Sequence, residues 1–512
     1  MKLAIRFSML LAFASTAALG QIPYPNPFTH VIIVDQENRT VDNLLGSNSP
    51  SNQFYLPGLN FATSGRAWTK VKGKKNVFTV QSVAIPLASK LGSGDSVEAD
   101  DYDPGHGHKV WVSACDSPVK TDPSTDCTMD GFNHVGVACD AGATGCPGPA
   151  YPTYAYVQYK DVAPYFQIAA QYSYANYMFQ TNQGPSFPSH QFTFGGTSQP
   201  GVGTEPTWFV AENMVGGANN GCIASSGGTV ALVDPANQTE TTKIYPCFTH
   251  RTMADLFAAP PVPLSPVTWT YYTPGQGSLW SAPDAISTIC TDVKGKCTGP
   301  YWTKGKTNGY IDVNPADAIT DINNCNLKQM SWIIPTGVES DHAGSTDGSG
   351  PSWVSSIVNA VGGYNNNGTV ANTCGYWNDT VILITWDDWG GWYDHVVPPP
   401  LSSLAPAVAS SYVYGFRVPL FVVSAYTPPG TVGNVMGLDY GAMLKFVEET
   451  FGGLGTISED PSNPYADYYA NDDLSEFFQF GHTPYPFQLI NAPLNSDVFL
   501  NPARPIDPPD ND

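Results

Sequence analysis

The chain of 512 residues has few charged side chains, and few of these are basic. Charged residues make up 13% of the sequence, where about 25% is usual, and 22 basic side chains against 44 acidic ones give a net charge of −22. Such a chain lacks the basic surface that binds polyanions. We therefore expect neither nucleic acid nor an anionic membrane surface as a partner held by charge.

Long apolar runs and common nucleotide-binding motifs are also missing. The apolar run Phe7–Leu19 is shorter than the ~20 residues of a membrane-spanning helix, and no later run is long enough. It follows two basic residues and ends in small residues, which is typical of a signal peptide. The sequence has no P-loop, GxGxxG or HExxH motif, no CxxC pair and no internal repeat. We expect 1–20 to be a signal peptide, no transmembrane segment, and a secreted or periplasmic protein.

The ten cysteines are an even number in a chain with an export signal, which indicates disulfides rather than metal thiolates or a catalytic thiol. Spacing cannot fix their pairing, but neighbours in the sequence suggest five bonds. These are Cys115–Cys127, Cys139–Cys146, Cys222–Cys247, Cys290–Cys297 and Cys325–Cys374.

The stretch Thr385–Pro400 (TWDDWGGWYDHVVPPP) carries two adjacent carboxylates among three tryptophans. The apolar run Val381–Ile384 before it predicts a buried strand, so Asp387 and Asp388 would lie just past its carboxyl end, where open α/β sheets bind ligands. Paired carboxylates in apolar surroundings repel each other unless a cation or a proton neutralises them. The alternative is a solvated acidic turn.

A second strand is predicted at His30–Val34 (HVIIV), and Glu37 and Asn38 follow it as the paired aspartates follow theirs. Carboxylate and amide oxygens are hard ligands that suit Ca²⁺, Mg²⁺ or Mn²⁺. Taken alone, the segment is explained more simply by a helix cap at Asn38 or Asp42 and a surface charge at Glu37.

Two further turns hold candidate groups. In Asp100–His108 (DDYDPGHGH), His106 and His108 would face one way in an extended segment and bind metal, although a turn of this composition needs no function. In GPSFPSH, Ser186 follows a Gly-Pro pair and precedes helix-compatible sequence, so its hydroxyl would lie beside the free N–H groups of a helix start, a seat for phosphate. Taken alone, this second turn is also explained by ordinary turn chemistry.

The remaining segments complete an α/β pattern. Ser331–Pro335 is a predicted strand followed by His342, and an apolar i, i+3, i+4, i+7 stripe predicts a helix ending near Val361, so this part forms a βαβ unit with the strand before Asp387. Arg417–Val423 predicts another strand, and Tyr440–Phe451 a helix packed on the core. We interpret 21–512 as one domain, with a cap-like insertion at 201–307 rich in Gly, Pro, Thr and Cys, and a surface tail at 481–512.

These candidates share a position after predicted strands or at turns, and together they suit metal-assisted phosphoryl transfer. A divalent cation lowers the pKa of a hydroxyl nucleophile and neutralises phosphoryl charge, while a protonated histidine donates to the leaving oxygen. The groups concerned are Glu37, Asn38, His106, Ser186, His342, Asp387 and Asp388.

Seven segments carry motifs in a fixed order: HVIIVDQENRTVDNLLG, DPGH, GPSFPS, DH at Asp341–His342, ITWDDWGGWYDHVVPPP, GFRVPLFVVSAYTPPGTV and DYGAMLKFVEETFG. Together they resemble the bacterial and fungal phosphoesterases that include phospholipases C and acid phosphatases. The first resembles that family's ENRSFD signature after a hydrophobic strand, the third its nucleophile turn GP(S/T)HPN, and the fifth its block ITWDExxGxYDHVPPP. The matches run from about His30 to about Phe480, nearly the whole mature chain.

The resemblance implies a three-layer α/β/α, alkaline-phosphatase-like fold with a mostly parallel central sheet and helices on both faces. It also implies one divalent metal ion, held by Glu37, Asn38, Ser186, Asp387 and Asp388. Ser186 would be the nucleophile that forms a phosphoseryl intermediate, and His106 and His342 would bind the phosphate, one of them as general acid. We expect five neighbours to support the site from behind or to brace its loops: Asp42, Asp103, Asp341, Asp394 and His395.

Departures from the family pattern bear on two of these implications. Asp388 stands where glutamate is commoner, which shortens its reach by one methylene and affects the choice of metal. Phe187 and Ser189 replace the His and Asn that usually follow the nucleophile, which affects substrate contacts.

The expected function is hydrolysis of a phosphoric ester, either a small phosphate ester, as in an acid phosphatase, or a phospholipid head group, as in a phospholipase C. The chain has no twin-arginine leader and little sequence after the last motif, which favours the phosphatase. Its many Trp and Tyr residues keep the phospholipase open, because they suit a choline-binding cage. A third alternative is an exported binding protein that keeps the fold without catalysis.

Overall fold

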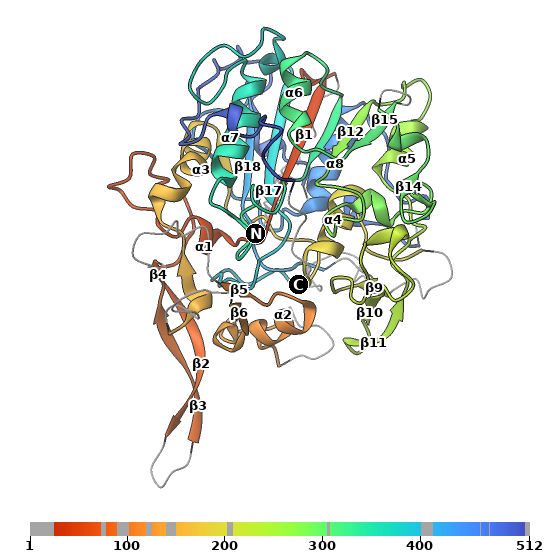
Figure 1. The fold of residues 1–512 in the computed structure, drawn as a ribbon. Coiled ribbons are helices and arrows are strands. Elements are labelled where there is room, and N and C mark those ends of the chain that lie inside the picture. The colour runs from red at the N-terminus through yellow and green to blue at the C-terminus, as the bar shows by residue number, and fades with distance from the viewer. Residues whose placement is uncertain are drawn as a thin grey trace, which may run out of the picture.

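A computed structural model describes residues 25–72, 78–89, 102–118, 125–139, 150–201, 208–304, 308–400, 413–460, 462–470 and 472–506. A six-stranded sheet lies at its centre (Figure 1). In spatial order its strands are β15 (Gly309–Asp312), β12 (Trp269–Tyr272), β16 (Met330–Ile333), β1 (His30–Gln36), β17 (Thr380–Trp386) and β18 (Leu420–Ser424). All neighbouring pairs are parallel except β17 and β18, which are antiparallel.

The central strands are buried on both faces, as their apolar and β-branched sequences predict. The strands predicted at His30–Val34 and Val381–Ile384 are confirmed, and each continues for two more residues, to Gln36 and Trp386. The predicted crossover from β16 through a helix to β17 is also present. Strands β16 and β17 lie on either side of β1 rather than beside each other.

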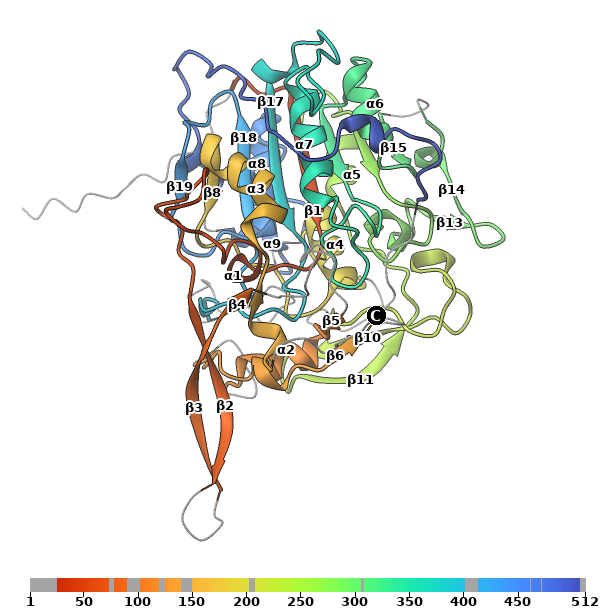
Figure 2. The ribbon, with the colours of Figure 1, turned by 60° about the vertical axis from the view of Figure 1, so that its left-hand side comes forward.

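Helices cover both faces of the sheet, which confirms the predicted three-layer α/β/α architecture (Figures 1 and 2). On one face, α3 (Tyr159–Gln171) and α6 (Asp317–Asn323) pack against α7 (Gly350–Val361). On the other face, α4 (Ser186–Gly195) packs against α8 (Tyr440–Thr450).

Smaller elements surround this core. The hairpin of β2 (Ser64–Lys72) and β3 (Phe78–Pro86) projects from the body of the molecule (Figure 2). The other elements are α1 (Val41–Leu44), α2 (His108–Cys115), α5 (Met253–Ala258), α9 (Ala466–Tyr469), β4 (Ala88–Ser89) with β7 (Ala155–Tyr156), β5 (Tyr102–Pro104) with β6 (Val137–Cys139), β8 (Ser173–Ala175) with β19 (Thr431–Gly433), and β13 (Thr291–Asp292) with β14 (Cys297–Thr298).

The segment 201–307 is partly a cap and partly core. Its antiparallel sheet of β9 (Phe209–Val210), β10 (Val230–Asp234) and β11 (Thr239–Ile244) lies outside the central sheet. The same segment also supplies β12, which pairs with β16 in the core. The prediction that the whole of 201–307 is an insertion is therefore corrected, since β12 belongs to the central sheet. The sequence does not show this strand clearly, because Gly, Pro and Thr residues surround its WTYY segment.

Four of the predicted disulfides are confirmed, and they are Cys115–Cys127, Cys222–Cys247, Cys290–Cys297 and Cys325–Cys374. The fifth involves Cys146, which lies outside the described residues, as does the predicted signal peptide 1–20. Among the described helices, none combines the length and apolar character needed to cross a membrane.

Candidate active site

Glu37 and Asp387 lie side by side at the carboxyl end of the central sheet. The last residues of β1 and β17, Gln36 and Trp386, are paired in parallel register. The chain therefore leaves both strands at the same level, and the N–H of Asp387 donates to the carbonyl oxygen of Gln36 at 2.9 Å. Both carboxylates are fully buried.

The two loops that follow these strands interlock. Asn38 has a φ of 60°, in the left-handed region that Asn tolerates better than most residues. Gly390 has a φ of 57°, and a Cβ placed on it would lie 2.1 Å from the carbonyl oxygen of Asn38. Its N–H donates to Oδ1 of Asp388 at 2.7 Å. A side chain at Gly390 would therefore displace Asn38.

Ser186 is the first residue of α4, directly after Pro185. The turn before it is fixed by Asn182, whose side chain accepts the N–H of Gly184 at 2.7 Å and donates to Oγ of Ser189 at 2.7 Å. Proline before the helix and small residues in the turn explain why the chain turns directly before α4.

The structure brings Ser186 together with the predicted metal ligands. Its Oγ lies 3.2 Å from Oε2 of Glu37, 3.2 Å from Oδ2 of Asp388 and 3.4 Å from Oδ1 of Asn38. The backbone N–H of Asn38 donates to Oδ1 of Asp387 at 3.0 Å. The five predicted ligands, scattered over some 350 residues of sequence, thus form one cluster.

The Asn38 amide lies between two carboxylates and two histidines. Its oxygen faces Oε2 of Glu37 and Oδ1 of Asp387, and its nitrogen faces the imidazoles of His106 and His342. The reversed amide would donate to those carboxylates at 3.1 and 3.0 Å and accept from the histidines, so hydrogen bonding alone favours reversal.

The charge of the cluster fits a bound cation. Burial raises the pKa of Glu37 well above its usual value, and the nearby charges of Asp387 and Asp388 raise it further. Carboxylates in such a site ionise together only when a cation offsets their repulsion. Three carboxylates, one amide oxygen and one hydroxyl form a donor set that a divalent cation accepts, so these residues fit the expected metal ion.

His106 and His342 present the same nitrogen to the cluster. Nδ1 of His106 lies 2.9 Å from the carbonyl oxygen of Pro104, and Nδ1 of His342 lies 2.7 Å from that of Ala343. Each Nδ1 therefore carries the proton, and each Nε2 faces Asn38. A second proton on Nε2 would make either imidazole a cation that can hold or protonate an anion.

Two of the five expected supporting residues lie next to these histidines. Oδ2 of Asp341 accepts hydrogen bonds from Tyr165 at 2.9 Å and from the indole of Trp386 at 2.8 Å, which ties the loop before His342 to the end of β17. Asp103 lines the pocket that adjoins His106.

The other three, Asp42, Asp394 and His395, form a separate cluster with Arg417, in which all but His395 are buried. Nη2 of Arg417 lies 3.0 Å from Oδ2 of Asp394 and 3.4 Å from Oδ1 of Asp42, and Nδ1 of His395 lies 2.7 Å from Oδ2 of Asp42. Asp42, Asp394 and His395 are close enough to bind a metal ion, but Arg417 already supplies a positive charge. They brace the loop after β17 against α1.

Sequence reasoning missed His190 and Asp35. Nε2 of His190 lies 2.9 Å from Oε1 of Glu37, and Nδ1 lies 3.4 Å from Oδ2 of Asp35. Both spacings were visible in the sequence, since His190 is one helical turn after Ser186 and Asp35 is two strand residues before Glu37, on the same face.

The prediction that His106 and His108 face one way is wrong. Gly107 is the N-cap of α2, so a helix begins at His108 and the segment is not extended. Nδ1 of His108 pairs instead with Oε1 of Glu240 at 2.7 Å.

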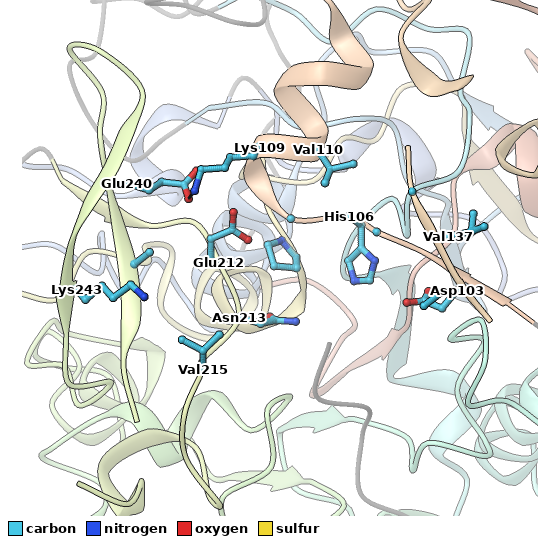
Figure 3. A pocket seen from close by; sticks show the side chains of 16 residues that line it. Asp103, His106, Lys109, Val110, Val137, Glu212, Asn213, Val215, Glu240 and Lys243 are labelled. Carbon is cyan, nitrogen blue, oxygen red and sulfur yellow. Dashed lines mark hydrogen bonds and ion pairs between the residues drawn. The ribbon is translucent and has the colours of Figure 1, made fainter. Parts of the chain in front are cut away.

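A pocket of about 600 Å³ opens beside His106 (Figure 3). Its walls come from the β5–β6 region, the start of α2 and the β9–β11 sheet. Figure 3 shows His106 and Asp103 on one side of the pocket and the charged side chains of the cap on the other. Those of the cap are Glu212, Glu240 and Lys243, and Lys109 of α2 lies beside them.

A model of the Phosphoesterase family matches residues 28–454, from the start of β1 to beyond α8. The chain belongs to the phosphoesterase family. The match covers every loop that carries a predicted ligand, the Ser186 turn and both histidines. The resemblance seen in the sequence is therefore confirmed.

The relatives with assigned names include phospholipases C. The non-hemolytic phospholipase C of Burkholderia pseudomallei (strain K96243) is 28% identical over 199 residues, which cover 35% of this chain and 27% of that protein. The hemolytic phospholipase C of Pseudomonas aeruginosa is 22% identical over 501 residues, which cover 91% of this chain and 58% of that protein. The chain thus spans less than two thirds of the length of these relatives.

Among solved structures, a protein in the alkaline phosphatase superfamily from Vibrio parahaemolyticus aligns with a TM-score of 0.30 and 10% identity. The alignment covers 58% of this chain and 61% of that one. A likeness at that level bears on neither the site nor the activity of this phosphoesterase.

Proposed function

We propose that this phosphoesterase is an exported, metal-dependent hydrolase of phosphoric esters that acts as an acid-phosphatase-like enzyme through a phosphoseryl intermediate on Ser186. One observation carries the proposal. Oγ of Ser186 lies within hydrogen-bonding distance of Glu37, Asn38 and Asp388, while the Nε2 atoms of two histidines approach Asn38 from the other side. The four disulfides support export, because such bonds persist in oxidising compartments.

The residues of the chain have distinct roles in this reaction. A divalent cation bound by the oxygen cluster would lower the pKa of the Ser186 hydroxyl and offset charge on the phosphoryl oxygens. The Ser186 hydroxyl first loses its proton to solvent. Its Oγ then attacks phosphorus, and the ester oxygen leaves with a proton from His106 or His342. A water molecule then attacks the phosphoserine and releases inorganic phosphate. The positive end of the α4 dipole favours the anion throughout.

The second candidate is a phospholipase C that cleaves a choline phosphodiester. The names of the relatives support it, and so does the pocket, since Glu212 and Glu240 lie where a cationic head group would be attracted. A binding protein without catalysis is less well supported, because the proposed nucleophile lies beside the proposed oxygen ligands.

Hydrolysis of two chromogenic esters separates the candidates. We expect the metal-loaded protein to cleave p-nitrophenyl phosphate with a kcat/KM at least tenfold above that for p-nitrophenyl phosphorylcholine, and we expect EDTA to abolish both rates until Mn²⁺ or Zn²⁺ is restored. The reverse preference would establish the phospholipase. Failure to cleave either ester with any divalent metal would refute the hydrolase.

The pocket also predicts a pH dependence of substrate binding. Burial raises the pKa of Glu212 to about 7, and the neighbouring charge of Glu240 contributes. Glu212 is therefore neutral below about pH 7 and negative above it, when it repels an anionic ester in the same pocket. We expect the ratio of wild-type KM to Glu212→Gln KM to rise from near one at pH 5.5 to about three to ten at pH 8.5.

The substrate ionises to the same extent in both assays at a given pH, so its contribution cancels in the ratio of the two KM values. Glu476→Gln is the matched control, because burial also raises the pKa of Glu476. Glu476 lies outside the pocket, where its carboxylate accepts a hydrogen bond from the N–H of Asn434. Its KM should follow the wild-type value at every pH. A flat ratio for Glu212→Gln would contradict a role for Glu212 in the pocket.

A further inference from the structure

His190 reaches the active site from the helix that carries Ser186. The two residues are one turn of α4 apart, so both side chains face the ends of β1 and β17. The imidazole is fully buried, and each ring nitrogen lies beside a carboxylate. Nε2 is 2.9 Å from Oε1 of Glu37, and Nδ1 is 3.4 Å from Oδ2 of Asp35.

Asp387 turns one of its oxygens towards the same imidazole. Its Oδ1 accepts the N–H groups of Asn38 and Asp388 at 3.0 and 2.7 Å. Its Oδ2 is buried, accepts no hydrogen bond from the described residues, and lies 3.8 Å from Nε2 of His190. A buried carboxylate oxygen in this state costs free energy unless a cation compensates it.

Three ligand atoms therefore converge. Glu37, Asp387 and His190 each offer one atom, all within 4.8 Å of one another. Two ligands of one Zn²⁺ or Mn²⁺ ion, each bound at about 2.1 Å, lie roughly 3.0 to 3.5 Å apart. The separations of 2.9 and 3.8 Å around Nε2 bracket this range. Because Oε2 of Glu37 faces Ser186, Glu37 connects the imidazole to the oxygen cluster.

We propose that His190 is a nitrogen ligand of the metal centre and that Asp35 is a positioning residue that accepts the Nδ1–H of its imidazole. The inference rests on the metal dependence of the proposed function. Histidines that bind metal through one nitrogen donate the N–H of the other to a carboxylate or carbonyl, and Asp35 occupies that place. A nitrogen ligand favours Mn²⁺, Fe²⁺, Co²⁺ or Zn²⁺ over Ca²⁺ and Mg²⁺.

Pulsed electron paramagnetic resonance of the full chain with one equivalent of Mn²⁺ tests the proposal directly. We expect the ¹⁴N coupling of a directly bound imidazole in the wild-type protein. His190→Gln should lose it, whereas His106→Gln and His342→Gln should retain it. Absence of the coupling in the wild-type protein, or its persistence in His190→Gln, would overturn the proposal.

Metal affinity gives a second measurement. Titration calorimetry should show Mn²⁺ and Zn²⁺ affinity lowered by about 10- to 100-fold in His190→Gln and by about tenfold in Asp35→Asn, with Mg²⁺ affinity changed least. If His190→Gln does not fold, the double variant His106→Gln/His342→Gln decides, because it keeps His190. Retained ¹⁴N coupling there supports the proposal, and lost coupling refutes it.

These measurements separate the inference from the proposed function. A protein that binds Mn²⁺ through His190 but cleaves no ester would refute the hydrolase and leave the ligand assignment standing. A protein that needs metal for hydrolysis but shows no nitrogen coupling would refute the ligand and leave the hydrolase.

Discussion

Replacing Ser186 with alanine is expected to lower kcat for a phosphate monoester by on the order of 10⁴-fold or more. The hydroxyl is the atom that attacks phosphorus in the proposed reaction, and its Oγ lies within 3.2 to 3.4 Å of three predicted metal ligands. Because Ser186 is one of five oxygen donors, metal affinity should change far less than turnover. Steady-state kinetics and metal analysis of the same preparation measure both.

Ser198→Ala provides the matched control for this variant. Ser198 is also buried and lies just beyond α4, but its hydroxyl donates to the carbonyl oxygen of Val210 at 3.0 Å, away from the cluster. Its kcat should stay within a few-fold of the wild-type value. If Ser186→Ala kept a tenth of the wild-type kcat, the serine would have no place in the mechanism.

Replacing Arg417 with methionine is expected to lower the free energy of unfolding by about 3 to 5 kcal/mol. The guanidinium is fully buried and binds Asp394 and Asp42, and Nη1 donates to the carbonyl oxygens of Asn60 and Asn176 at 2.8 and 3.0 Å. Methionine keeps much of the volume but leaves buried carboxylates without their cation. Urea unfolding at pH 7 measures the loss.

The control is Arg251→Met, which removes an ion pair with the exposed Glu459 and should cost under about 1 kcal/mol. The deficit of Arg417→Met should also shrink at acid pH. Burial raises the pKa of Asp394 to about 6 even with Arg417 present. A carboxyl with a raised pKa stabilises the fold at low pH and loses that contribution as pH rises. Equal losses at pH 5 and pH 8 would contradict an electrostatic role.

The sequence was informative where function depends on strand ends. Two apolar runs followed by Glu37-Asn38 and Asp387-Asp388 predict a shared edge of a sheet, because parallel strands bring their carboxyl ends together. The structure places the two strands next to each other in register. Local sequence patterns do not predict which strands are neighbours, so this pairing is known only from the tertiary structure.

The features that sequence reasoning missed depend on local geometry. The helix that begins at His108 separates that residue from His106, and only the N-cap at Gly107 determines this. Glu212 and Glu240 meet through pairing of short strands in the cap, for which the sequence carries no periodic signal. The spacing of His190 from Ser186 is visible in the sequence, but a histidine inside an apolar helix is more often explained by packing than by chemistry.

The stereochemical course at phosphorus distinguishes a phosphoserine intermediate from direct attack by water. A chiral isotopically labelled phosphorothioate ester, hydrolysed by the metal-loaded protein in labelled water, reports how many displacements occur. Attack by Ser186 followed by attack of water on the phosphoserine gives two inversions, so we expect net retention. Net inversion would mean that water attacks the ester directly, and it would contradict the serine mechanism.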